Sequence, residues 1–372
     1  AIRILHIDSI SICINHAKYP FSQDRSCVLM LPTLSLTDIK KLFLPVLCCI
    51  FFVACQPSER PIIPETTAVN DDNKVEVDLN VLCEQLSHEM QQVDHQRTLF
   101  VLQQINQNLK VCLPLMTTAE QLKLLDHSTQ MYEKFLFVER TPAQQAAFEQ
   151  YVNAVAAHPT LQQQHFEQMN LRDQYLVKHQ GQGYVEVVTL NDGGVGYRRS
   201  PQYLARVFAP YLPEAEQAFI QALADQNTQP IFDHHTIQVE PLVLAERALF
   251  WENYLKRYPD SRYASDARYL YHSYSQLLFI GNHNDKVSEN YHGLQSIDPQ
   301  HLAAFEHLAQ QTKSTLGQKA IQFLKLIQKH SDLSSISLEQ EYQNTVQSIQ
   351  QELNLVQVNF KDKNCFADAV CS

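Results

Sequence analysis

Glycine is nearly absent from this chain, and no other feature limits the possible folds as strongly. The 372 residues include only 8 glycines, and five of these lie between Gly181 and Gly196. Glycine is unfavourable inside helices and is used where the backbone must turn sharply. The distribution therefore predicts a mainly α-helical chain with one turn-rich insertion. The hydrophobic share of 45% and the charged share of 19% are ordinary for a globular protein with a packed core.

The insertion, residues 181–200, is predicted to be a small β-hairpin. Tyr184 to Leu190 is rich in strand-forming residues, and Val195 to Arg198 supplies a returning strand. Between them, Asn191-Asp192-Gly193-Gly194 has the composition of a tight hairpin turn.

Apolar residues recur at helical spacing through residues 77–180, which predicts an N-terminal helical region. One stripe begins at Leu79, and the next extends from Leu102 to Cys112. The link between them is short, so these two helices should lie antiparallel.

Three sequence patterns farther along the chain predict helix starts. Thr117-Thr118-Ala119-Glu120 has the spacing of a capping box, in which the two end side chains satisfy each other's backbone amides. Thr141-Pro142 and Ser200-Pro201 each place a capping residue before proline, which favours the first turn of a helix.

Residues 201–372 are predicted to form a second helical region that ends in a cysteine-bearing tail. The segment from Trp251 to Ala267, Trp-Glu-Asn-Tyr-Leu-Lys-Arg-Tyr-Pro-Asp-Ser-Arg-Tyr-Ala-Ser-Asp-Ala, resembles a tetratricopeptide-like helix pair. It is similar to the form found in outer-membrane-assembly lipoproteins, with Ala267 as the small residue at a close helix crossing. A second junction at Asp298-Pro299 follows Pro259 by 40 residues, more than the roughly 34 of the standard repeat. We expect an irregular α-solenoid or a helical bundle of paired helices, and both remain open.

A charged and then apolar segment precedes the helical regions. Lys40 and Lys41 lead into a 13-residue apolar run that ends at Ala54. The run is typical of a secretory signal and is shorter than the about 20 residues that cross a bilayer. A plain signal peptide or a short uncleaved anchor are the alternatives to the assignment that follows.

The end of this run, Phe52-Val53-Ala54-Cys55, resembles a bacterial lipobox, with Phe52 in place of the usual leucine. The resemblance implies transfer of a diacylglyceryl group to the Cys55 sulfur, cleavage after Ala54 and acylation of the new amino terminus. Several acyl chains anchor a protein stably, where one binds only marginally. Gln56, rather than an aspartate, follows the cysteine. In a Gram-negative cell that residue implies the periplasmic face of the outer membrane.

The position of the run suggests where translation begins. Met30 lies ten residues before Lys40, a normal distance for a signal peptide. We therefore expect residues 1–29 to be an over-extended gene start and residues 30–54 to be the signal peptide. Residues 55–76 are polar and contain proline, which predicts a flexible tether.

Cleavage would leave five of the nine cysteines, and acylation of Cys55 would leave four that can pair. These are Cys83, Cys112, Cys365 and Cys371. Three pairings are possible, and sequence proximity favours Cys83 with Cys112 and Cys365 with Cys371. An oxidising compartment favours disulfides, and four free thiols are the alternative.

The charge argues against nucleic acid as a partner. The net charge is −11, whereas nucleic-acid binding requires a basic surface that displaces counterions from phosphates. The expected partners are the membrane, through the lipid anchor, and a protein of the cell envelope.

We predict no catalytic residue, metal ligand or cofactor. There is no phosphate-binding glycine loop and no Gly-x-Ser-x-Gly turn. His88-Glu89 opens like a zinc-protease motif, but Gln92 stands where the second histidine is required. Asp233-His234-His235 lacks partners at metal-ligand spacing, and Asn282-His283-Asn284-Asp285 lacks the remaining ligands of a calcium loop.

Candidate protein-binding residues follow the helix junction at Pro259. Arg262, Arg268, Tyr269 and Tyr271 fall outside the apolar stripe, and tyrosine and arginine are favoured at interfaces. The alternative is that these tyrosines only pack helices together.

The leading hypothesis is a membrane-anchored periplasmic scaffold or adaptor that binds another envelope protein without catalysis. An envelope enzyme, such as a cell-wall hydrolase with the hairpin at its cleft, is the alternative. A purely structural accessory subunit is a third possibility.

Overall fold

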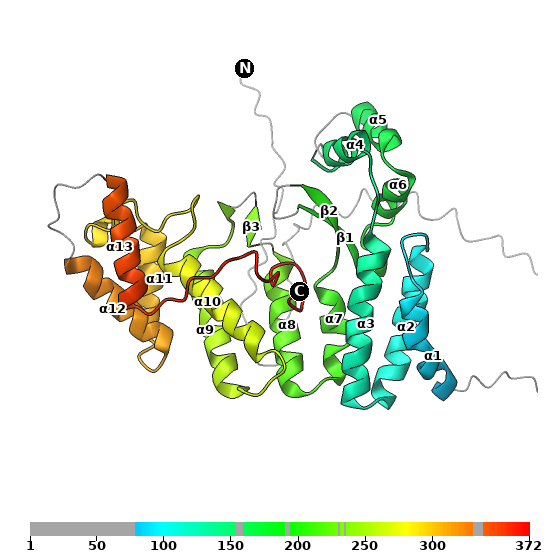
Figure 1. The fold of residues 1–372 in the computed structure, drawn as a ribbon, viewed down its shortest axis with the longest axis horizontal. Helices are drawn as coiled ribbons and strands as arrows, with labels where there is room; N and C mark the ends of the chain where they lie inside the picture. Colours follow the sequence, from blue (N-terminus) through cyan, green and yellow to red (C-terminus); the bar gives the residue numbers. More distant parts are fainter. Residues whose placement is uncertain (1–78, 154–158, 190–193, 230, 234–235, 330–337) are drawn as a thin grey trace, which may run out of the picture. The chain divides into compact units, whose positions relative to one another are not determined.

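A computed structural model describes residues 79–153, 159–189, 194–229, 231–233, 236–329 and 338–372. The predictions about residues 1–29, the signal peptide 30–54, Cys55 and the tether 55–76 lie outside these residues. Within them the chain is mainly helical and carries a β-hairpin, which confirms the predicted fold class (Figure 1).

The helices and strands of the described residues are numbered in chain order. They are α1 (Leu79–Gln91), α2 (Leu99–Cys112), α3 (Thr118–Leu136), α4 (Pro142–Asn153), α5 (Pro159–Gln168), α6 (Leu171–Lys178), α7 (Gln202–Val207), α8 (Glu214–Thr228), α9 (Pro241–Arg257), α10 (Ala264–Phe279), α11 (Pro299–Ala309), α12 (Thr315–Lys329) and α13 (Leu338–Glu352). The strands are β1 (Val185–Thr189), β2 (Val195–Arg199), β3 (Phe232–Asp233) and β4 (Thr236–Ile237).

The predicted hairpin is formed by β1 and β2, which pair antiparallel from Val185 opposite Arg199 to Thr189 opposite Val195. Val195 belongs to a small separate core with Phe148 of α4 and Phe166 of α5. A second antiparallel pair, β3 with β4, is two residues long on each side and was not predicted. Strands of this length are too short to show an alternation of apolar and polar residues, so the sequence pattern did not predict them.

Helices α1 and α2 form the predicted pair. Most of their stripe residues, such as Leu86 and Leu109, are buried, whereas Leu79 at the start of α1 is 45% exposed. A disulfide joins Cys83 to Cys112. The second proximity-favoured pair, Cys365 with Cys371, is also disulfide-bonded.

The predicted capping box at the start of α3 is present. The Glu120 amide donates to Thr117 Oγ1 at 3.4 Å, and the Thr117 amide donates to a Glu120 carboxylate oxygen at 2.8 Å. This arrangement satisfies two amides that the first turn of a helix leaves unpaired.

From α7 to α12 the helices form three successive pairs, α7/α8, α9/α10 and α11/α12, and each pair contacts the next. Phe219 of α8 lies against Trp251 of α9, with ring centroids 5.1 Å apart, and α9 also contacts α11. Ala267 is fully buried where α10 pairs with α9, so no larger side chain holds the two helices apart. Packing between sequence neighbours is the arrangement of an irregular α-solenoid.

The C-terminal segment, residues 354–372, has no regular secondary structure. It runs across α10 and α8 toward β2 (Figure 1). Cys365, Phe366 and Ala369 of this segment are buried in the main core. The tail is therefore part of the packed structure.

Candidate protein-binding surface

The structure does not gather the four predicted binding residues into one surface. Arg268 is exposed, and Arg262 forms an ion pair with Asp126 of α3 at 3.3 Å. Tyr271 is only 8% exposed, and burial, with a smaller effect from Glu252, raises its pKa to about 12. Tyr271 therefore packs helices, as the alternative interpretation had it.

The Tyr269 hydroxyl is hydrogen-bonded to backbone carbonyl oxygens of the C-terminal segment of the same chain. The hydroxyl lies 3.1 Å from the carbonyl oxygen of Lys363 and 3.3 Å from that of Asn359. Asn227 of α8 acts in the same way, because its side-chain amide donates to the carbonyls of Cys365 and Asp368 at 2.8 and 2.6 Å. The surface around Tyr269 is thus already occupied by the C-terminal segment.

A buried ion pair fixes the end of that segment. Arg199 of β2 is almost fully buried and donates through Nε to a carboxylate oxygen of Asp368 at 3.0 Å. Its other nitrogens donate to the hydroxyls of Ser128 and Thr129 on α3 at 3.2 Å. The contact joins three elements that are distant in sequence.

An open pocket of about 430 Å³ lies at the junction of α3, α4 and α6. It is lined by His95, Phe137, Val138, Glu139, Arg140, Thr141, Gln144, Asn170 and Arg172. We call this pocket, together with Leu171, which lies between the lining residues Asn170 and Arg172 in the sequence, the α3–α6 surface.

Two large apolar side chains of this surface are exposed. Phe137, directly after α3, is 56% exposed, and Leu171, the first residue of α6, is 80% exposed. The His95 and Phe137 rings pack edge to face, with centroids 5.8 Å apart. Exposed apolar groups beside arginines are typical of protein-binding sites.

Arg140 anchors the floor of this surface through a two-point ion pair. It donates to both carboxylate oxygens of the fully buried Asp173, at 2.8 and 2.7 Å. Burial alone would lower the pKa of Arg140, but the contact with Asp173 outweighs it and the net shift is upward. The Tyr197 hydroxyl donates to the same carboxylate at 3.0 Å, and burial, together with that carboxylate, raises its pKa.

Arg172 is held just as firmly. Its guanidinium donates to the carbonyls of Arg97 at 2.7 Å and Phe135 at 2.9 Å, and it lies 4.3 Å from the centre of the Phe135 ring. Burial lowers its pKa. The backbone that carries Leu171 is therefore rigid before any partner arrives, which limits the entropy lost on binding.

Sequence reasoning missed Phe137 and Leu171. Phe137 follows directly after the apolar residues Phe135 and Leu136, and Leu171 opens a helix after the capping residue Asn170. The available signal was an apolar residue at a helix boundary, outside the buried face.

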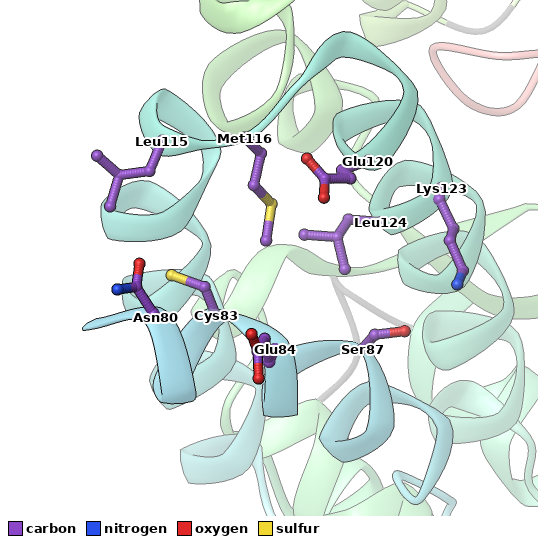
Figure 2. Close-up of a pocket in the computed structure, with 9 residues that line it drawn as sticks. All are labelled: Asn80, Cys83, Glu84, Ser87, Leu115, Met116, Glu120, Lys123 and Leu124. Atoms are coloured by element: carbon purple, nitrogen blue, oxygen red, sulfur yellow. The ribbon is translucent and has the colours of Figure 1, made fainter. Parts of the chain in front are cut away.

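A second pocket, of about 320 Å³, separates α1 from the start of α3. Figure 2 shows Met116 and Leu124 between α1 and the start of α3. Ser87 and Lys123 lie on the side of the pocket that is farther from Leu115. Ser87 Oγ and His127 Nδ1 are hydrogen-bonded at 2.8 Å. A nucleophile and a base in contact are the first requirement of a serine hydrolase.

The group that would orient the histidine is not acidic. The second ring nitrogen of His127 lies 3.4 Å from the side-chain amide of Gln91, where hydrolases place a carboxylate. The contact also links α1 to α3, which is a sufficient structural role. Among the residues that the structure describes, no cluster of three His, Cys, Asp or Glu side chains is arranged to hold a metal ion.

Over the same described ranges, no helix is both long and apolar enough to span a membrane. Comparison of the chain with protein-family models, with curated proteins and with solved structures finds no match.

Proposed function

We propose that this protein is a lipid-anchored adaptor of the cell envelope that binds a partner protein at the α3–α6 surface. The proposal rests on the exposure of Phe137 and Leu171 next to Arg140 and Arg172, whose hydrogen bonds hold the surrounding chain in place. Aromatic residues and arginine are enriched at protein interfaces, and groups that are held in place before binding lose less entropy when a partner docks.

Anchoring rests on the lipobox-like end of the apolar run, Phe52-Val53-Ala54-Cys55, which would place the helical domain at the periplasmic face of an outer membrane. The two disulfides support a location outside the cytoplasm, because reducing compartments rarely keep such bonds. Radiolabelled palmitate should enter the wild-type protein and not a Cys55→Ser variant. Equal labelling of both would exclude lipidation at Cys55.

Partner binding is tested by crosslinking in intact cells followed by purification of the full chain. Leu171→Glu places a carboxylate in the first turn of α6, where the helix dipole favours it, so folding should be preserved. We expect the crosslinked partner to be reduced at least about tenfold, as for loss of a hot-spot side chain.

Leu242→Glu is the matched control, since Leu242 is also exposed in the first turn of a helix, α9, away from the α3–α6 surface. It should leave the crosslink unchanged. An undiminished crosslink in Leu171→Glu would remove the basis for this site.

A cell-wall hydrolase is the second candidate, favoured by the Ser87–His127 contact beside the pocket of Figure 2. A serine-reactive fluorophosphonate probe should then label the wild-type chain and not Ser87→Ala. Absence of labelling in both would leave the contact with a structural role only.

A further inference from the structure

Eight side-chain amides meet in a cleft of about 610 Å³. They come from the end of α10, the turn after it, α13 and the C-terminal segment. Two are Asn282 and Asn344, and the other six are Gln276, Gln340, Gln343, Gln347, Gln350 and Gln357. We call this the amide cleft.

Among the residues that the structure describes, those that line the amide cleft carry little charge. These lining residues include no carboxylate, and their basic side chains are Lys286 and His283. Lys286 is already engaged, because its ammonium lies 3.7 Å from Glu289 and 4.7 Å from the centre of the Tyr342 ring. An ionic ligand would find little compensation here, so the cleft suits a neutral one.

The amides retain hydrogen-bonding capacity. The side chains of Gln347, Gln350 and Gln357 form no hydrogen bond with any residue that the structure describes. Each amide offers two donors and one acceptor oxygen. A sugar hydroxyl both donates and accepts, so a row of amides complements a row of hydroxyls.

The spacing of the amides distinguishes a glycan from a peptide. Gln340, Gln343, Gln347 and Gln350 follow one side of α13 in steps of three and four residues, or about 5 Å at 1.5 Å per residue. An extended peptide presents groups to one side every two residues, about 6.6 to 6.8 Å, and falls out of step. A pyranose ring in an extended β-linked glycan advances the chain by about one such step.

We propose that the amide cleft binds a short segment of a neutral, extended glycan chain, with successive sugars hydrogen-bonded to successive amides of α13. This site is separate from the α3–α6 surface, so the inference does not depend on the adaptor function.

The test is titration of the purified full-length chain with chitotetraose, a neutral β-linked oligomer of N-acetylglucosamine, followed by calorimetry. The probe should bind to wild type. In the double variant Gln347→Ala, Gln350→Ala its affinity should fall at least about tenfold, because two hydrogen-bonding amides are removed. Alanine favours helix, so α13 should persist in the variant, which circular dichroism checks.

The double variant Gln322→Ala, Gln328→Ala is the control, because both residues are exposed on α12 and neither lines the cleft. It should bind chitotetraose like wild type. The inference is overturned if chitotetraose does not bind, if both double variants bind equally well, or if a blocked, uncharged tetra-alanine peptide binds the cleft in its place.

Discussion

Glu252 shows how much a single buried carboxylate organises. It lies on α9, is only 5% exposed, and accepts hydrogen bonds from the amides of Thr315 at 2.6 Å and Leu316 at 3.3 Å. The Ser314 hydroxyl and Lys256 complete its partners. The first amides of α12 are thus capped by a side chain from another helix, a role that short-range capping patterns cannot reveal.

Burial would raise the pKa of Glu252, but the hydrogen bonds from Lys256, Ser314 and the α12 amides outweigh it and hold the pKa below its usual value of 4.5. A lowered folded-state pKa stabilises the fold above the unfolded-state pKa. This stabilisation is lost as the pH falls through the folded-state pKa.

We predict that Glu252→Gln lowers the free energy of unfolding by about 1.5–3 kcal/mol at pH 7, as for hydrogen bonds to a charged group. The difference from wild type should shrink below about pH 4.5, and urea unfolding at several pH values measures it. Glu246→Gln, exposed on the same helix, should change the free energy by less than about 0.5 kcal/mol. A pH-independent difference for Glu252→Gln would contradict this account.

At the scale of elements, the helix pairs were predictable because each is specified by neighbours in sequence. The stripe residues of α1 and α2, the capping box of α3 and the prolines that start α4 and α9 are read within a few residues. The disulfide between α1 and α2 follows from the same local geometry, since a short link brings Cys83 and Cys112 to the same end of the pair.

The two disulfides should differ in their contributions to stability. Cys83–Cys112 spans 29 residues and Cys365–Cys371 spans 6, so loop entropy assigns them about 3–4 and about 2 kcal/mol respectively. Replacing each pair with alanines and comparing urea midpoints checks the order. A larger loss on removing Cys365–Cys371 would mean that native contacts of the tail outweigh loop entropy.

At the scale of the whole molecule, the C-terminal segment ties distant helices together. Arg199 and Asp368 are 169 residues apart in sequence, and Asn227 reaches the same loop from α8. The loop that makes these contacts is closed by the Cys365–Cys371 disulfide. Its residues Cys365 and Ala369 are buried, which holds Asp368 beside Arg199 of β2.

We predict that Asp368→Asn releases the tail and costs about 1.5–3 kcal/mol, because the buried Arg199 loses the charge of its partner. Hydrogen exchange in residues 354–372 should accelerate, and limited proteolysis should cut there first. Asp362→Asn, which removes only a local contact with Asn359, is the control. Unchanged exchange in Asp368→Asn would show that apolar packing alone holds the segment.

In the candidate sites, too, some features follow from the local sequence and others depend on tertiary packing. Tyr269 and Arg262 were singled out correctly as residues outside the apolar stripe, yet the structure engages them with Lys363 and Asp126 of the chain itself. Phe137 and Leu171 were missed, because exposure beside a pocket depends on which helices pack nearby.

The sequence by itself determined the helical class, the hairpin at the glycine cluster and the capped start of α3, and it favoured the two disulfides between cysteines close in sequence. Those features depend on backbone preferences and short loops, whose energies are decided within about ten to twenty residues. Only the tertiary structure decided that Glu252 caps α12, that the tail covers Tyr269 and that glutamines of α13 face Gln276 of α10. These contacts join residues about 60 to 95 apart, and they exist because of how whole helical faces pack, which no local pattern encodes.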